Sequence, residues 1–127
     1  MPRNILIVED DPPLRGLLQT LLRHAGERNV MTCSDGDEAI ELLSQKSFDV
    51  ILLDLMMPGT DGLAVIDYLR KHRPAQLRVV LVMTAASDEI TERLDPTVVH
   101  GVISKPFDND SVVGLVLEIF QTAAGAA

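Results

Sequence analysis

Short apolar runs alternate along the chain with segments in which hydrophobic residues recur every three or four positions. Five apolar runs are predicted to be strands: Ile5–Val8, Val30–Cys33, Asp49–Leu55, Val79–Met83 and Val98–Ile103. Continuous apolar runs are typical of strands that are buried on both faces, whereas strands with one wet face alternate polar and apolar residues. The pattern therefore favours a parallel sheet covered by helices on both sides.

The intervening segments carry the i, i+3, i+4 spacing of amphipathic helices. The first helix is predicted to begin at Pro12 and Pro13 and to end at Gly26, and the second opens at Asp35. Three more are predicted from Leu63 to just before Pro74, over Ser87–Leu94 and over Asp108–Gln121. Strict alternation of strands and helices predicts an α/β, flavodoxin-like (βα)5 fold: a doubly wound five-stranded parallel sheet in the order 2-1-3-4-5, with helices on both faces.

Length and charge narrow the class of protein. The chain has 127 residues, 46% of them hydrophobic, and a formal net charge of −8. We expect one folded domain over residues 1–121, with 122–127 as a tail or a truncated linker. Acidity argues against contact of this domain with nucleic acid or with an anionic membrane. No apolar run is long enough to span a membrane or to form a signal peptide, so we expect a cytoplasmic location.

Polar side chains follow the predicted strands at the point where each strand ends. They are Glu9, Asp10 and Asp11 after the first strand, Asp54 in the third, Thr84 after the fourth and Lys105 after the fifth. In open parallel sheets, ligands bind beyond the carboxyl ends of the strands, near the switch in strand order. Taken singly, Asp10 or Asp11 could cap a helix, and the threonine and lysine could be ordinary turn and surface residues. Asp54 is different, because it continues a buried run and a buried carboxylate needs a cation or a hydrogen-bond donor.

Clustered carboxylates without histidine or paired cysteine favour Mg²⁺ over zinc; Cys33 is the single cysteine. A carboxylate beside Mg²⁺ can act as a nucleophile toward phosphorus, and a lysine and a hydroxyl can bind the other phosphoryl oxygens. The sequence contains no P-loop, dinucleotide-binding or nucleophile-elbow motif. His24 and His72 fall near predicted helix ends, where interaction with the helix dipole explains them.

Four motifs together resemble the receiver domain of two-component response regulators. They are Ile5–Asp11, Asp54–Pro58 followed by Gly62, Met83–Ala85 and Lys105–Phe107, in the order and spacing of that family. The resemblance extends from Ile5 to about Phe120. It implies a phosphorylatable signalling module that switches the interactions of a partner or an output domain, with a histidine kinase or a histidine phosphotransfer protein as the phosphodonor. Self-phosphorylation and slow autodephosphorylation are the only reactions it implies, so we do not expect a turnover enzyme.

The resemblance also implies a role for each matching residue. Asp54 corresponds to the phosphoacceptor, Asp10 to a direct Mg²⁺ ligand, and Glu9 to a ligand that acts through water. The backbone carbonyl of Met56 would complete the protein's metal ligands. The Thr84 hydroxyl would move to meet the phosphoryl group, and Lys105 would bridge Asp54 and its phosphate. A cis peptide before Pro106 is also implied.

Two other functions fit the same layout. A phosphatase or phosphotransferase could use Asp54 as a transient nucleophile, but such enzymes usually place a general acid two residues later, where this chain has Met56. A degenerate receiver that only binds partners would have lost Asp54, Thr84 or Lys105, and all three are present. One departure from the family is Val102, which replaces the usual aromatic switch residue, so another shift must carry the signal.

The last predicted helix has more apolar surface than one sheet can cover. Seven apolar residues spread over roughly 200° of it; they are Val112, Val113, Leu115, Val116, Leu117, Ile119 and Phe120. The surplus, predicted at Val113 and Leu117, is either singly exposed or packed against another protein. In the resembled family, the face formed by helix 4, strand 5 and helix 5 is the usual partner surface. A homodimer or an effector-domain contact through apolar packing is therefore predicted there.

Overall fold

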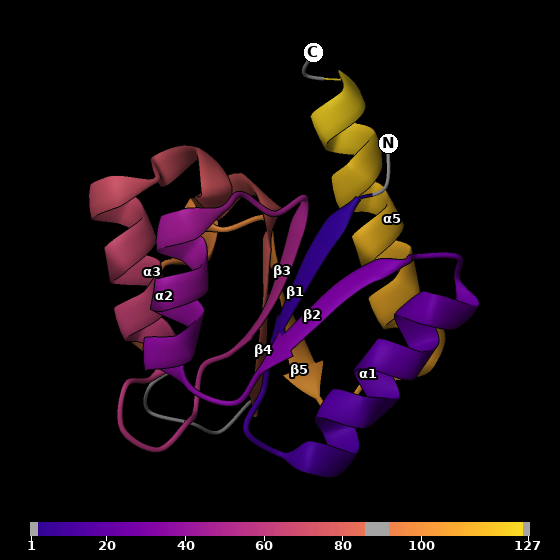
Figure 1. The fold of residues 1–127 in the computed structure, drawn as a ribbon, viewed down its shortest axis with the longest axis horizontal. Helices are drawn as coiled ribbons and strands as arrows, with labels where there is room; N and C mark the ends of the chain where they lie inside the picture. Colours follow the sequence, from indigo (N-terminus) through magenta and orange to yellow (C-terminus); the bar gives the residue numbers. More distant parts are fainter. Residues whose placement is uncertain (1–2, 86–91, 126–127) are drawn as a thin grey trace.

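A parallel sheet lies between two layers of helices in the computed structural model, which describes residues 3–85 and 92–125 (Figure 1). Its strands run in the order β2-β1-β3-β4-β5. They are β1 (Asn4–Val8), β2 (Asn29–Cys33), β3 (Val50–Asp54), β4 (Val80–Ala85) and β5 (Gly101–Lys105). The predicted fold class and strand order are confirmed.

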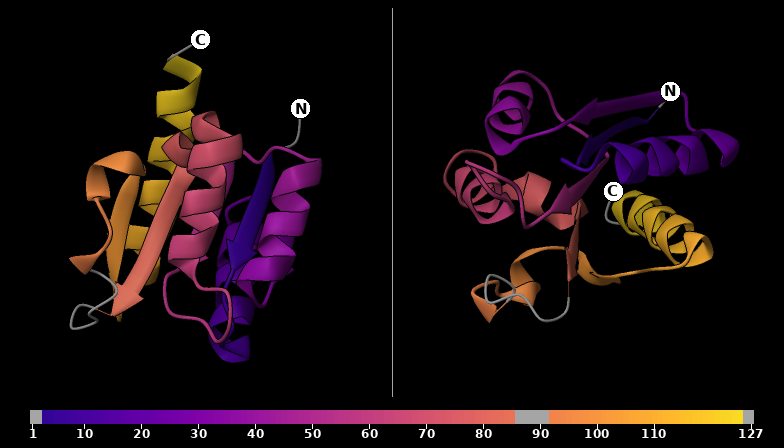
Figure 2. Two further views of the ribbon diagram at one scale, coloured as in Figure 1. Left: turned by 90° about the vertical axis from the view of Figure 1, so that its left-hand side faces the viewer. Right: turned by 90° about the horizontal axis from the view of Figure 1, so that it is seen from below.

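The helices divide between the two faces of the sheet, as the end-on view in Figure 2 shows. On one face lie α2 (Gly36–Gln45) and α3 (Gly62–His72), and on the other lie α1 (Pro12–His24) and α5 (Asn109–Gly125). Two 3-10 turns, η1 (Pro74–Val79) and η2 (Pro96–Val98), precede β4 and β5. Most of the helix predicted over Ser87–Leu94 lies outside the described residues.

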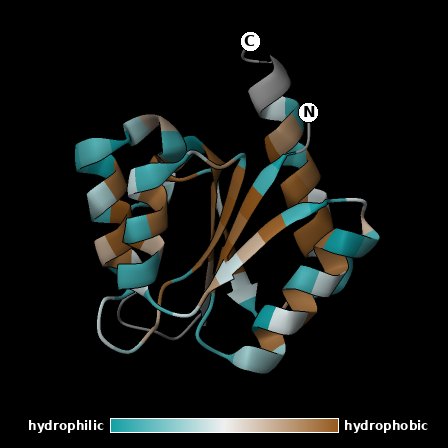
Figure 3. Cartoon of the chain, in the orientation of Figure 1, coloured by the Kyte–Doolittle hydropathy of each residue, from teal (hydrophilic) through white to brown (hydrophobic). Residues whose placement is uncertain are grey.

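Successive residues of the central strands enter two separate cores, because side chains alternate between the faces of a sheet. In β1, Ile5 and Ile7 pack toward α1 and α5, whereas Leu6 and Val8 pack toward α2 and α3. All four are fully buried. Figure 3 shows the hydrophobic colour concentrated on the strands and on the sides of the helices that face them. Burial on both faces explains why the strand sequences do not alternate.

The helix starts use different chemistry. Asp35 and Asp61 cap α2 and α3 by accepting hydrogen bonds from the backbone N–H groups of Glu38 (2.8 Å) and Ala64 (3.0 Å). Asp11 occupies the corresponding N-cap position of α1, one of the alternatives that the sequence allowed, but its side chain makes no capping hydrogen bond. Pro12 and Pro13 supply the first two helical positions, and proline has no N–H to offer.

Two element boundaries differ from the prediction by three residues or more. The fifth strand was predicted from Val98 but begins at Gly101, because Asp95 accepts a hydrogen bond from the Thr97 N–H and closes the η2 turn instead. The last helix continues past Gln121 to Gly125. Ala123 and Ala124 are strong helix formers, which explains the extension into the predicted tail. The domain boundary at residue 121 remains a prediction.

Candidate functional site

The polar residues that follow the strands meet at one edge of the sheet because the strands are parallel and in register. Val8 pairs with Leu53, so Glu9 and Asp54 follow at the same level on neighbouring strands. Asp54 pairs in turn with Met83, and Ala85 pairs with Lys105. The chain leaves β1 toward β2 on one side and β3 toward β4 on the other, so this edge is the switch point of the sheet.

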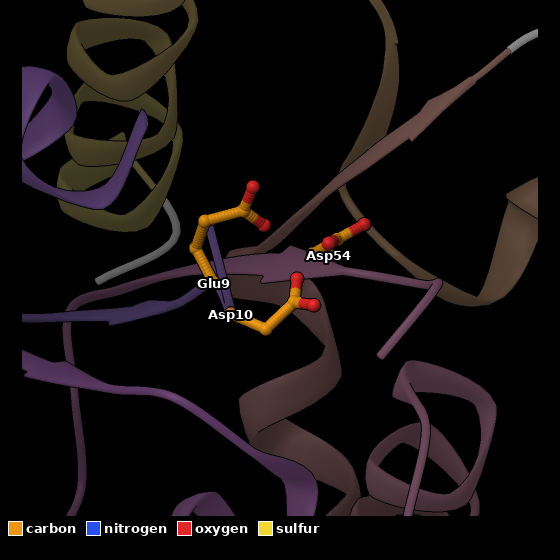
Figure 4. Close-up of side chains that lie close together, drawn as sticks. All are labelled: Glu9, Asp10 and Asp54. Carbon is orange, nitrogen blue, oxygen red and sulfur yellow. The ribbon is translucent and has the colours of Figure 1, made fainter. Parts of the chain in front are cut away.

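Three carboxylates converge at this edge. One oxygen from each of Glu9, Asp10 and Asp54 lies within 4.8 Å of the others. Figure 4 shows the three side chains projecting into the same space from the ends of β1 and β3. Glu9 has no exposed surface and Asp54 has 3%, whereas Asp10 is half-buried at the mouth. Like charges this close repel one another strongly at buried positions, so the cluster needs positive charge.

Lys105 supplies one positive charge to the cluster. Its Nζ lies 3.0 Å from Glu9 Oε1 and 3.4 Å from Asp54 Oδ2. The backbone N–H of Met56 donates a hydrogen bond of 3.2 Å to Asp54 Oδ1. Asp54 therefore has a hydrogen-bond donor at Oδ1 and a positive charge beside Oδ2, which offsets the cost of burying its carboxylate.

Protonation equilibria in the cluster are strongly perturbed. Burial, reinforced by Asp54, raises the pKa of Glu9 to about 8. Burial and the neighbouring Asp54 also raise the pKa of Asp10. Burial alone would lower the pKa of Lys105, but its hydrogen bond to Glu9 and the charge of Asp54 outweigh this and raise it. One lysine thus fails to neutralise three carboxylates.

A divalent cation would balance the negative charge that Lys105 leaves on the three carboxylates. Within the described part of the chain, Glu9 Oε2 is a buried side-chain oxygen without a hydrogen-bond partner. The donor set consists of carboxylate oxygens, which suit Mg²⁺. A cavity of about 390 Å³, lined by Asp10, Met56, Met57, Pro58 and Asp61, opens beside the cluster and leads to solvent.

The other predicted site residues lie around the cluster. Thr84 is 1% exposed at the end of β4, and its hydroxyl donates to the Ala85 carbonyl (3.3 Å). The Met56 side chain is 51% exposed, so its backbone, not its thioether, faces Asp54. The Lys105–Pro106 peptide is cis. Val102 lies on β5 and is 37% exposed.

Sequence reasoning missed one residue that shapes this edge, Arg15, and the close packing of another, Gly62. The guanidinium of Arg15, on the first turns of α1, donates to the Glu9 carbonyl (2.9 Å). The available signal was an arginine four residues after the acidic run Glu9–Asp11, about one helical turn into the predicted helix. Gly62 belongs to the motif of Asp54, and it packs so closely that a Cβ there would lie 2.5 Å from the Asp54 carbonyl oxygen. The three histidines lie elsewhere: His24 and His72 are in last helical turns, and His100 faces Glu118 at 3.4 Å.

Comparison with known proteins identifies the family. The sequence matches the family model of the response regulator receiver domain over residues 5–117. It is 39% identical over 87 residues to the transcriptional activator protein PfeR of Pseudomonas aeruginosa, covering 68% of this chain and 28% of that protein. It is 37% identical over 126 residues to the DNA-binding transcriptional regulator NtrC of Escherichia coli, covering 91% and 24%. The chain thus spans about a quarter of the length of these relatives. No helix within the described ranges is long and apolar enough to cross a membrane.

Solved structures of receiver domains have the same fold as this chain. The BeF3-activated receiver domain of nitrogen regulatory protein C (NtrC) superposes with a TM-score of 0.79 at 33% identity, over 97% of this chain and 98% of that one. The receiver domain of the sensor histidine kinase PA1611 from Pseudomonas aeruginosa, which carries a magnesium ion in its active site cleft, superposes with a TM-score of 0.83 at 24% identity, over 95% and 99%. The sequence match, the strand order and these superpositions lead to one conclusion: the chain belongs to the family of receiver domains of two-component response regulators.

Proposed function

We propose that this receiver domain accepts a phosphoryl group on Asp54. The observation that carries the proposal is the convergence of Glu9, Asp10 and Asp54 within 4.8 Å, with Lys105 forming ion pairs with Glu9 and Asp54. A buried carboxylate with this environment at the switch point of a parallel sheet is suited to attack phosphorus.

The chemistry assigns a task to each side chain around Asp54. An Asp54 Oδ attacks phosphorus and forms an acyl phosphate, while the bond from phosphorus to the donor breaks and the donor leaves with its electron pair. The Met56 N–H already holds Oδ1 (3.2 Å), which orients the carboxylate. Lys105, 3.4 Å from Oδ2, is placed to neutralise charge on the transferred group. Thr84, at the end of the adjoining strand, supplies a hydroxyl for a phosphoryl oxygen.

Mg²⁺ is the cofactor that we assign to the cluster. Asp10 and Asp54 would hold it with carboxylate oxygens, the Met56 carbonyl would add a third ligand, and Glu9 would act through a water. When bound, it would neutralise developing charge on the phosphoryl oxygens. The unpartnered Glu9 Oε2 and the raised pKa of Glu9 support this assignment, because both show that the protein alone leaves the site underneutralised. The magnesium ion in the PA1611 receiver lends further support.

The phosphoryl-transfer reaction indicates the phosphodonor, and the exposed surface of β5 and α5 indicates the output partner. The donor is a phosphohistidine, on a histidine kinase or a histidine phosphotransfer protein, which reaches Asp54 through the open side at Asp10 and Met56. The output surface lies on β5 and α5, where Val102 and Leu117 are 37% and 43% exposed. We assign that surface to a second copy or to an effector domain; in the relatives named as transcriptional regulators, the matched region makes up only about a quarter of the protein.

Phosphorylation can be tested with acetyl phosphate and Mg²⁺, followed by intact-mass spectrometry. Wild type should gain the mass of one phosphoryl group, and Asp54→Asn should gain none. Asp11→Asn is the matched control, because Asp11 is exposed, makes no capping bond and lies near the same edge. Equal uptake by Asp54→Asn and wild type would place the phosphoryl group on another residue.

A further inference from the structure

We propose that Arg15 is a positioning residue for the turn between β1 and α1 that presents Glu9 and Asp10. The proposal rests on the Mg²⁺ site proposed above, and it concerns what holds that site in shape. Arg15 is on α1, half-buried, and its side chain reaches back across the turn.

Arg15 holds the backbone on both sides of Asp10. Its Nη1 donates to the Glu9 carbonyl at 2.9 Å, and its backbone N–H donates to the Asp11 carbonyl at 2.9 Å. The guanidinium bond is particular to arginine, whereas the backbone bond is the ordinary first hydrogen bond of α1. A guanidinium is charged at every relevant pH and is rigid, so the contact is both strong and directional.

The turn has few other hydrogen bonds because its residues supply few donors and acceptors to one another. Pro12 and Pro13 lack backbone N–H groups, and Asp11 makes no side-chain cap. Before Asp10, the Glu9 N–H donates to the Cys33 carbonyl at 3.1 Å, which fixes the end of β1 but not the path that follows. Removal of the Arg15 side chain would leave the Glu9 carbonyl without the contact that ties it to α1.

The position of this turn matters for metal binding. Mg²⁺ requires near-ideal octahedral geometry and tolerates little displacement of its ligands. Side chains outside the ligand set that orient the ligands change metal affinity substantially when they are removed. Glu9 is fully buried and fixed by Lys105, but Asp10 is half-buried and depends on the backbone of the turn for its placement.

Calorimetric titration with MgCl₂ tests the proposal. Arg15→Gln should raise the Mg²⁺ dissociation constant about 3- to 10-fold. Arg23→Gln removes the same charge from an exposed position in the last turn of α1, and it should change the constant less than about twofold, since screening weakens distant surface charges. Equal dissociation constants for the two variants would overturn the proposal. Should Arg15→Gln not fold, Arg15→Met keeps a similar stem, and comparison with Arg23→Met decides in the same way.

A metal-free measurement separates positioning from general destabilisation. In EDTA, amide hydrogen exchange followed by NMR should be several-fold faster at Glu9 in Arg15→Gln, whereas the amides of the β3 interior keep their wild-type rates. Uniform acceleration across the sheet would instead mean a purely structural role and would overturn the proposal. Failure of the proposed Mg²⁺ site would give different results. Either wild type would show no saturable Mg²⁺ binding, or Asp10→Asn would bind Mg²⁺ as tightly as wild type.

Discussion

Glu9 makes this fold less stable as the pH rises, and replacing it with glutamine should remove that effect. Burial and Asp54 raise the pKa of Glu9 from 4.5 to about 8 in the folded protein. Above pH 4.5 the unfolded chain releases this proton while the folded protein keeps it. The stabilising contribution of the protonated carboxyl is therefore complete below pH 4.5 and is lost as the pH rises toward 8. Glutamine resembles the protonated form, and its oxygen can still accept from Lys105.

The size of the effect follows from the width of that window. Each pH unit between the two pKa values costs about 1.4 kcal/mol, so the full window sets a ceiling of about 4–5 kcal/mol. Asp10, whose pKa is also raised, shares this cost with Glu9, and solvent reaches the cluster at Asp10. We therefore expect the free energy of unfolding of wild type to fall by about 1–3 kcal/mol relative to Glu9→Gln between pH 5 and pH 8.

Urea unfolding in EDTA, followed by far-UV circular dichroism at four pH values from 5 to 8, measures this difference. Glu41→Gln is the control, since Glu41 is exposed on α2 and the change in formal charge is identical. Its pH profile should run parallel to that of wild type. A Glu9→Gln profile that also runs parallel to wild type would show that Glu9 ionises normally in the fold, and would refute the reasoning from burial and charge crowding.

Three further outcomes are expected. Mg²⁺ should raise the melting temperature of wild type, because it binds the folded cluster, and thermal melts should show most of that shift lost in Asp10→Asn; an undiminished shift would move the metal elsewhere. Gly36→Ala should cost about 2–4 kcal/mol in chemical unfolding, because its Cβ would lie 2.3 Å from the Thr60 carbonyl oxygen, whereas Gly16→Ala, in open space on α1, should gain about 0.5–1 kcal/mol. Sedimentation of the phosphorylated protein should show association that Leu117→Glu abolishes, because Leu117 is 43% exposed on α5; monomeric behaviour of both would leave that apolar surface without a role in self-association.

Local patterns were sufficient for most of the secondary structure. Apolar runs and helical spacing placed all five strands and four described helices, because burial imposes a period that survives in sequence. The exception is the start of β5. Val98 and Val99 are apolar enough for a strand, but Asp95 and Pro96 favour a 3-10 turn at that point. On α5, the helical pattern predicted more apolar surface than the sheet can cover, but it did not determine which residues are exposed. The packing in the structure shows that Leu117 is exposed while Val113 is half-buried.

The sequence by itself also identified Asp54 as a special residue, since a carboxylate within a buried run cannot remain without a partner. Only the tertiary structure determines which residues contact Asp54. Lys105 lies 3.4 Å from Asp54 across 51 positions of chain because parallel register brings the ends of β3, β4 and β5 to one edge. The contact between Arg15 and the Glu9 carbonyl, and the unpartnered Glu9 Oε2, follow from the same convergence. Spacing along a chain carries the periods of strands and helices, but distances between side chains of different elements arise only when the sheet assembles and brings their ends together.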